Sequence, residues 1–474
     1  MLRHTLSTVP IAEVNEAEWS SKLRGLVRGQ VLCPCDDGYD SARRGYNGRI
    51  DRRPAIIARC AGVSDVLACV GVAREIESPI CIRAGGHSAA GFSVCEGGFV
   101  LDVSQMKGIR VDPRRRVVRA EAGITWGELD RETQAFGLAT TGARISTTGV
   151  AGVTLGGGYG WLMRKHGLAI DNLISCDIVT ADKRFISASA TENADLFWGL
   201  RGGGGNFGVV TSFEFRLHAV GPLVTGGMCF YSAAQARELL RFYREFMASA
   251  PDEITALFNF LIAPSAPFIP PYLRGMPVVA IAVCHAGASL EEAERDLACL
   301  IQVGPPLLAR IKPRPYTVVQ KFFDAAGVFG NHVHARSGHL PELSDAVIER
   351  LVAHASGITS PLSIVMISSL GAAVARVGEH DTAFSHRRTR FDLAINSVWT
   401  EAEDSDRYIE WTDSFWTAMQ PFCDGVYVNE LGEDAEERVR EAYNPATYTR
   451  LQRLKKNYDP DNVFRFNANI KLTA

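Results

Sequence analysis

Short runs of β-branched and aromatic residues, separated by glycines, fill the chain between residues 54 and 220. Apolar residues at helical spacing predict helices over 63–75, capped by Ser64 and ended by Pro79, and over 126–133, ended by Gly137. Strands are expected at 80–83, 99–103, 117–120 and 209–215. This irregular order indicates an α+β fold rather than a regular series of β-α-β units.

The pattern changes after Gly221-Pro222. Longer helical patterns cover 233–248 and 290–301, and β-rich runs lie between them at 276–283 and 363–367. A sheet and helices in one lobe suit a substrate domain. The last segment, 443–470, is amphipathic and turns at Asp459-Pro460-Asp461-Asn462.

Length and charge narrow the classes of function. A chain of 474 residues is long enough for two substantial domains, and its 46% hydrophobic and 22% charged residues are ordinary for a globular protein. A net charge of −3 gives no electrostatic reason to bind nucleic acid or an acidic membrane. Residues 1–10 lack the apolar core of a signal peptide, and no stretch is apolar enough to span a bilayer, which favours a cytoplasmic location.

Cysteine and histidine patterns give no metal site. The 11 cysteines are odd in number and include no Cys-x-x-Cys pair. His332, His334 and His339 lie close in sequence, but no carboxylate or cysteine at ligand spacing completes a set. We therefore expect no metal, and a structural or substrate-facing role for these histidines.

Two glycine-rich loops carry the strongest signal. Arg83-Ala84-Gly85-Gly86-His87-Ser88 follows an apolar run, and a second loop covers 147–160. Glycines at a strand end let backbone N–H groups approach a pyrophosphate closely. Because a phosphate cradle needs no imidazole, His87 indicates a second function beside the same ligand.

A third glycine cluster, Gly203-x-Gly205-x-x-Gly208, matches the dinucleotide fingerprint formally. A nicotinamide site needs a helix to begin there and an acidic residue about twenty positions later. Residues 209–215 alternate like a strand instead, and no Asp or Glu occurs between 222 and 231. The sequence therefore predicts no nicotinamide site, and it contains no P-loop and no Gly-x-Ser-x-Gly motif.

The two loops resemble the FAD-binding loops of the vanillyl-alcohol-oxidase superfamily, in its berberine-bridge-enzyme-like branch. The resemblance continues through 161–172, 179–182, 192–211, 427–429 and 458–470. It implies two lobes: a PCMH-type FAD-binding domain over 1–222, and a substrate domain over 223–424 with an antiparallel sheet covered by helices. Residues 425–474 would form a C-terminal segment that returns to the FAD domain.

The resemblance also implies how FAD is held. In the family the histidine of the first loop carries the flavin covalently through its 8α-methyl, and here that residue is His87. Many relatives add a second link through a cysteine, but that position is Ile145 in this chain. We expect a single covalent link, and FAD contacts from Ile82, Arg83, Ala84, Gly85, Gly86, Ser88, Gly91, Phe92, Thr147, Thr148, Gly149, Ala151, Gly152, Leu155, Gly156, Gly157, Gly160, Gly208, Val209, Val210, Asn467 and Asn469.

The implied activity is that of an oxidase. Hydride would pass from a substrate C–H beside an O–H or N–H to flavin N5, with a base taking the proton and O2 reoxidising the flavin to give H2O2. Relatives often carry a tyrosine after the Tyr-x-Asn motif, where this chain has Glu430. Strand-like alternation would place Glu430 opposite Tyr427, and we assign it as the base, with Tyr427 as the second candidate.

Two further residues take roles by resemblance. Thr148 occupies a loop position near the flavin edge that O2 approaches, and Arg387 ends a segment that often reaches the substrate. The partners implied are a small-molecule substrate and O2, in a monomer or homodimer. A dehydrogenase with another electron acceptor, or a flavin-holding protein that binds a metabolite without turnover, are the alternatives.

Overall fold

The first lobe contains two small sheets and a two-stranded pairing of β7 (Leu138–Ala139) with β11 (His218–Ala219), in a computed structural model that describes residues 16–78 and 80–472. In the first sheet, strands β2, β4 and β3 are parallel and β1 pairs antiparallel with β2. The second sheet is antiparallel, in the order β5-β6-β10-β8-β9. Their bounds are β1 (Gln30–Leu32), β2 (Ile56–Arg59), β3 (Ile80–Arg83), β4 (Phe99–Asp102), β5 (Ile109–Asp112), β6 (Val117–Glu121), β8 (Leu173–Val179), β9 (Phe185–Ser189) and β10 (Val209–Arg216).

The expected helices of this lobe are present, with one difference in capping. Helix α3 (Val63–Glu75) has Gly62, not Ser64, as its N-cap. The acidic side chain in its first turn, Asp65, accepts the N–H groups of Gly29 and Ala61 and so fixes the preceding loops. Helix α4 (Trp126–Gln134) begins with a capping box between Thr125 and Glu128. The prediction of Ser64 as the N-cap was wrong, because the carboxylate of Asp65 binds the backbone N–H groups of this turn instead. Pro79, predicted to end the helix, and residues 1–15 lie outside the described residues.

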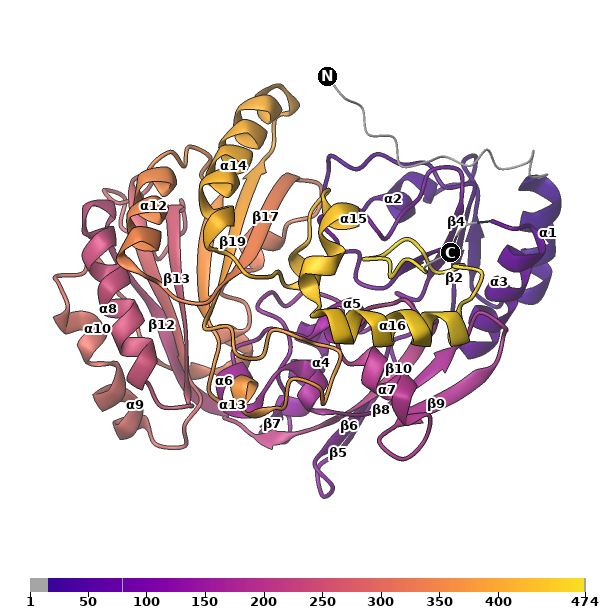
Figure 1. The fold of residues 1–474 in the computed structure, drawn as a ribbon, viewed down its shortest axis with the longest axis horizontal. Helices are drawn as coiled ribbons and strands as arrows, with labels where there is room; N and C mark the ends of the chain where they lie inside the picture. Colours follow the sequence, from indigo (N-terminus) through magenta and orange to yellow (C-terminus); the bar gives the residue numbers. More distant parts are fainter. Residues whose placement is uncertain (1–15, 79, 473–474) are drawn as a thin grey trace.

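One large antiparallel sheet forms the second lobe (Figure 1). Its strands follow the order β12-β14-β13-β18-β19-β17, and two short strands pair with the outer edge of β12. The bounds are β12 (Leu223–Ser232), β13 (Ile254–Ile262), β14 (Pro277–His285), β15 (Leu308–Ala309), β16 (Lys312–Pro315), β17 (His332–Leu340), β18 (Ile364–Ser369) and β19 (Phe391–Trp399). The domain boundary expected at residue 222 stays a prediction.

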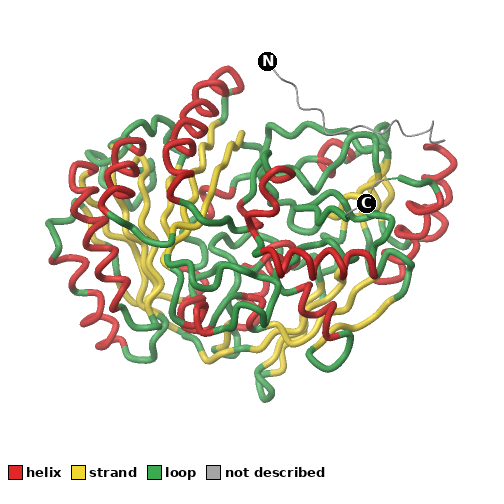
Figure 2. The backbone as a smooth tube through the Cα atoms, in the orientation of Figure 1, coloured by secondary structure: helices red, strands yellow, loops and turns green. Residues whose placement is uncertain are grey.

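Helices cover one face of this sheet, as Figure 2 shows by the red helices outside the yellow strands. Apolar side chains from α8 (Ala236–Ser249), α12 (Asp345–Ala355) and α14 (Ser405–Met419) share a core with every second residue of β19, namely Phe391, Leu393 and Ile395. Successive strand residues point to opposite faces. Asp392 and Ala394 therefore point toward the first lobe.

The helical pattern at 290–301 is divided in the structure. It forms α9 (Leu290–Leu297) and α10 (Cys299–Gln302), joined at Ala298. Helix α9 has Ser289 as its N-cap, whose side chain accepts the N–H of Glu292. Both helices lie at the outer edge of the second lobe (Figure 1).

The C-terminal segment returns to the first lobe through α16 (Pro445–Tyr458), where Leu451 and Leu454 join the core. Two residues one helical turn apart, Lys455 and Asp459, form a completely buried ion pair of 2.7 Å. The ammonium of Lys455 also donates to the carbonyls of Asn206 and Phe464, at 3.0 and 2.9 Å. Asp459 accepts the backbone N–H of Phe464. This pair fixes the terminal segment against the glycine-rich stretch before β10.

Replacing Lys455 with methionine should destabilise the fold strongly. Asp459 would remain buried without its counter-ion, which costs about 3–5 kcal/mol of unfolding free energy. Urea denaturation measures this change. The adjacent Lys456 is exposed, so Lys456→Met is the matched control and should change stability by less than about 0.5 kcal/mol. Equal losses in the two variants would contradict the assignment.

Candidate flavin site

A cavity of about 410 Å³ is lined by residues of both glycine-rich loops and of the C-terminal segment. This volume lies in the range of cofactor and ligand pockets. The lining includes His87 from the first loop, Thr148 from the second, and Tyr427 and Glu430 from the segment after α14. The structure thus brings together residues that lie far apart in the sequence: His87 and Glu430 are 343 positions apart, and the lining extends from Tyr46 to Ala468.

The two loops touch through their backbones. A Cβ atom added to Gly85 would stand 2.4 Å from the amide nitrogen of Gly149, and one added to Gly149 would stand 2.6 Å from that of Gly85. Real Cβ atoms do not approach so closely. Glycine at both positions is therefore required for the loops to meet.

His87 lies in a partly enclosed aromatic setting. Its Nε2 is 2.9 Å from the hydroxyl of Thr147, and its ring stacks on Tyr46 with centroids 5.1 Å apart. Phe329, from the second lobe, meets the same ring edge-on at 5.0 Å. Burial lowers the pKa of His87 to about 4. The imidazole is therefore neutral at pH 7 and keeps a nitrogen lone pair available for bond formation.

Most of the predicted FAD contacts line the cavity. These are Ile82, Ala84, Gly85, Gly86, His87, Ser88, Phe92, Thr148, Gly149, Ala151, Gly152, Leu155, Gly208, Val210 and Asn467. Among the described residues, the lining does not include Arg83, Gly91, Thr147, Gly156, Gly157, Gly160, Val209 or Asn469. Some of these support the site instead: Thr147 holds His87, and Gly156 leaves room for the amide of Asn429, which a Cβ would meet at 2.2 Å.

The glycine cluster before β10 belongs to the same cavity. Gly204 and Gly205 line it beside Gly208, and β10 begins at Val209. The strand expected at 209–215 is confirmed. Gly204 and Gly205 were not among the predicted contacts, although their position in the resembling stretch 192–211 was a signal for them.

Glu430 lines the cavity, in a backbone conformation that differs from the expected strand. Residues Val428–Glu430 form a 3-10 turn, η6. One carboxylate oxygen of Glu430 accepts from Arg144 at 2.8 Å, and both side chains are largely buried. The prediction of an extended strand with side chains on alternating faces was wrong for this segment. Residues 428–430 cross between the lobes and pair with none of the described strands. The tertiary fold nevertheless places this carboxylate in the cavity.

Arg144 is a site residue that the sequence analysis missed. It precedes Ile145 just before the second loop, and both residues line the cavity. Its guanidinium donates to Glu430 and to the hydroxyl of Ser368 on β18, and lies 5.9 Å from the centre of the Tyr159 ring. No pattern in the sequence marks this arginine, because its partners come from β18 and the C-terminal segment.

Tyr427 stacks on Tyr159, with centroids 3.9 Å apart. Its hydroxyl oxygen accepts the N–H of Gly158 at 2.8 Å and the side-chain amide of Asn429 at 2.7 Å. Burial raises the pKa of Tyr427 above its ordinary value. The phenol is therefore neutral at pH 7. This protonation state suits a residue that positions neighbouring groups by hydrogen bonds better than it suits a general base.

Arg387 does not reach the cavity, contrary to the expectation for it. Its side chain is completely buried and forms a bidentate ion pair with Asp171, both bonds being 2.8 Å, and also donates to Thr382 at 2.7 Å. Within the described part of the chain, the cavity lining includes neither Arg387 nor Asp171. Because Asp171 lies in the first lobe and Arg387 lies just before β19 of the second, this ion pair joins the two lobes.

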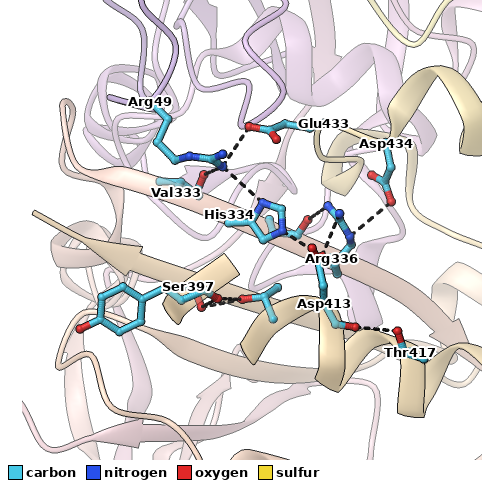
Figure 3. Close-up of polar contacts among 12 residues, drawn as sticks. Arg49, Val333, His334, Arg336, Ser397, Asp413, Thr417, Glu433 and Asp434 are labelled. Carbon is cyan, nitrogen blue, oxygen red and sulfur yellow. Dashed lines mark hydrogen bonds and ion pairs between the residues drawn. The ribbon is translucent and has the colours of Figure 1, made fainter. Parts of the chain in front are cut away.

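The histidines on β17 divide between the two faces of the sheet. His334 points to the helical face, where it pairs with Asp413 of α14 at 2.9 Å and accepts from Arg49 at 3.3 Å (Figure 3). Arg336 contacts the same Asp413 at 2.8 Å. His339 points the other way, and its Nε2 lies 3.1 Å from the hydroxyl of Tyr159 in the cavity wall. His334 is thus part of a structural network, and His339 lies behind the site.

The polar groups and the open space that line the cavity fit FAD. Asn467 donates its amide hydrogens to the carbonyls of Gly205 and Phe464, which leaves its buried side-chain oxygen without a donor among the described residues. A Cβ added at Gly152 or Gly205 would meet nothing within 4 Å, so open space borders both backbones. Unpaired acceptors and glycine-lined space are what a nucleotide cofactor with N–H and phosphate groups requires.

Comparisons with known proteins decide the family. The family models described as "FAD binding domain" and "Berberine and berberine like" match residues 54–189 and 426–471. An FAD-linked oxidoreductase of Dictyostelium discoideum is 30% identical over 94% of this chain and 95% of its own length. The chain belongs to the berberine-bridge-enzyme-like family of FAD-linked oxidoreductases.

Other members of this family are similarly close. The (R)-6-hydroxynicotine oxidase of Paenarthrobacter nicotinovorans is 31% identical over 94% of this chain and 97% of its own length. The crystal structure of 6-hydroxy-D-nicotine oxidase from Arthrobacter nicotinovorans superposes with a TM-score of 0.84 at 29% identity, covering 94% of this chain and 98% of that one. The predicted α+β fold of the family is confirmed. None of the helices in the described ranges is long and apolar enough to cross a membrane.

Proposed function

We propose that this berberine-bridge-enzyme-like protein is an oxidase of small organic molecules, with FAD attached through His87 alone. The observation that carries the proposal is the single cavity that contains both a neutral His87 and the carboxylate of Glu430. FAD, when bound, would accept hydride at N5 and transfer the electrons to O2, which yields H2O2. The protein would supply binding, orientation and proton transfer.

Glu430 would take the proton of a substrate O–H or N–H. A carboxylate that lines the cavity is within reach of a substrate placed beside the flavin. Arg144 holds one oxygen of Glu430 and fixes the orientation of the carboxylate, since a guanidinium donates along defined directions. Tyr427 is the weaker candidate because burial raises the pKa of its phenol, which is therefore protonated when a base is needed.

The substrate would be a sugar or a secondary metabolite. The relatives include a (R)-6-hydroxynicotine oxidase and a xylooligosaccharide oxidase, so a substrate panel should contain hydroxylated pyridines, oligosaccharides and phenols. Bleaching of the flavin absorbance under anaerobic conditions identifies the reducing substrate. Rapid recovery of the absorbance in air supports an oxidase, whereas recovery only with a quinone or another carrier would make the protein a dehydrogenase.

His87→Ala should release FAD from acid-precipitated protein, whereas the unaltered protein should give a yellow pellet. A colourless pellet from flavin-loaded unaltered protein would overturn the covalent link. The pH dependence gives a second check. An imidazole is protonated below its pKa, and burial lowers the pKa of His87 to about 4. Attachment to the apoprotein should therefore proceed at similar rates between about pH 5.5 and 8, rather than slow below about pH 6.5 as for an ordinary histidine.

Glu430→Gln keeps the shape of the side chain and removes the base. It should lower the rate of flavin reduction by about a hundredfold and leave FAD attachment unchanged. Stopped-flow absorbance measures both quantities. Glu433→Gln is the matched control, because Glu433 is 41% exposed and pairs with Arg49 instead of lining the cavity. Reduction at the unaltered rate in Glu430→Gln would assign the base elsewhere.

Thr148 would leave O2 a path to the flavin. Its side chain is half-buried and lines the cavity, and its carbonyl accepts the N–H of Trp126 at 2.9 Å. Thr148→Leu should slow reoxidation of the flavin several-fold and leave reduction by substrate within about twofold. Thr148→Val, which has the same shape as threonine, should behave as the unaltered protein if size alone controls access. Equal slowing of both half-reactions in Thr148→Leu would instead indicate damage to the loop.

A further inference from the structure

A row of polar side chains crosses the sheet directly behind Glu430. Asp392 on β19 pairs in register with His339 on β17 and with Ser368 on β18. Residues in register on adjacent strands point to the same face, here the face toward the first lobe. All three side chains are completely buried. Arg144 contacts Ser368, and Tyr159 contacts His339, so the row borders the proposed active site on both sides.

Three carboxylate oxygens between this row and the cavity have no hydrogen-bond donor among the described residues. They are both oxygens of Asp392 and the second oxygen of Glu430. The other oxygen of Glu430 accepts from Arg144. Buried carboxylate oxygens are normally paired, because an unpaired charge away from water is very costly. The two side chains are within hydrogen-bond reach of each other, which two ionised carboxylates do not tolerate.

The groups that face Asp392 supply a single positive charge. The cation is Arg144, which contacts Ser368 at one end of the row. His339 lies 3.6 Å from Asp392, and burial lowers its pKa well below the ordinary value, so its imidazole is neutral. Tyr159 and Cys423 also face this carboxylate, and burial raises the pKa of both. One arginine balances one carboxylate charge and leaves the second carboxyl to be neutral.

We propose that Asp392 and Glu430 share one proton, carried by Asp392 and donated to the oxygen of Glu430 that Arg144 does not hold. The pair then carries one negative charge, which Arg144 balances. Asp392 is a positioning residue in this arrangement, since it does not line the cavity and acts on the substrate only through Glu430. The inference rests on the proposed function of Glu430 as the base. Burial, and then the charge of Glu430, raise the pKa of Asp392 well above its ordinary value, in agreement with a carboxyl that keeps its proton.

The shared proton fixes both oxygens of the base before the substrate arrives. During turnover the O–H or N–H bond of the substrate would break and its proton would pass to Glu430, while bound FAD would supply the two-electron oxidation of the adjacent C–H. The pair then holds two protons and no charge, and one proton returns to solvent before the next cycle. Because Asp392 remains protonated throughout, its hydrogen bond holds the second oxygen of Glu430 in a fixed orientation between cycles.

Two substitutions distinguish Asp392 as a hydrogen-bond donor to Glu430 from Asp392 as a second negative charge. Asp392→Asn keeps a donor toward Glu430, so flavin reduction should stay within about threefold of the unaltered rate, with the same acid limb in its pH profile. Asp392→Leu removes the donor and leaves the Glu430 oxygen buried and unpaired. It should slow reduction at neutral pH about tenfold and move the acid limb to higher pH by about one unit. Thermal melting verifies that both variants are folded.

Infrared spectroscopy tests the proton without any turnover. The unaltered protein should show the C=O stretch of a buried carboxylic acid, shifted in D2O, that Asp392→Asn removes and Glu430→Gln shifts. Asp130 is the control, because it is a buried carboxyl whose pKa burial also raises and which does not line the cavity. Asp130→Asn should remove a different band and leave the acid limb unchanged. An unchanged carboxylic acid band in Asp392→Asn would overturn the proposal, and so would identical pH profiles for Asp392→Asn and Asp392→Leu. If only the assignment of Glu430 as the base fails, the infrared result should still be observed.

Discussion

The backbone contact between Gly85 and Gly149 is the constraint on which the site depends. Two loops that are 64 residues apart meet with no side chain between them. Their contact places the hydroxyl of Thr147 on the imidazole of His87 and opens the glycine-lined cavity on one side. Any side chain at either glycine would separate the loops, and the histidine would lose both its partner and its position in the cavity wall.

The second lobe closes the site through contacts with the first. The side-chain amide of Asn47 donates to the carbonyl of Val333 and its oxygen accepts the N–H of Val333, and Gly48 donates to the carbonyl of Asn331. These bonds hold the start of β17 beside the His87 loop, where Phe329 meets the imidazole. The enclosure that lowers the pKa of His87 therefore comes from both lobes. The packing of the lobes therefore sets the surroundings of the residue to which we propose that FAD is attached.

The large sheet has two faces with different tasks. On the helical face, Phe391, Leu393 and Ile395 build an apolar core with α8, α12 and α14. On the other face, the alternate residue Asp392 is as deeply buried but meets polar groups from the first lobe. Burial and the neighbouring Glu430 raise the pKa of this carboxyl, Arg144 opposes them, and the proposed shared proton would remove the remaining charge of Asp392. The charge balance of the proposed active site thus depends on residues of three separate segments.

The sequence by itself determined the fold class and FAD as the cofactor, and it predicted the two glycine-rich loops that line the cavity. The glycines of those loops are local requirements of backbone geometry, and His87 stands out because an imidazole serves no purpose in a phosphate cradle. Only the tertiary structure decided the environment of each charged group. Arg387 is occupied by Asp171, Arg144 and Glu430 pair across 286 positions, and Asp392 lies behind them. Local patterns predict which face of a strand or helix a residue takes, but the partners of a buried charge come from distant segments, whose meeting depends on the packing of the whole chain.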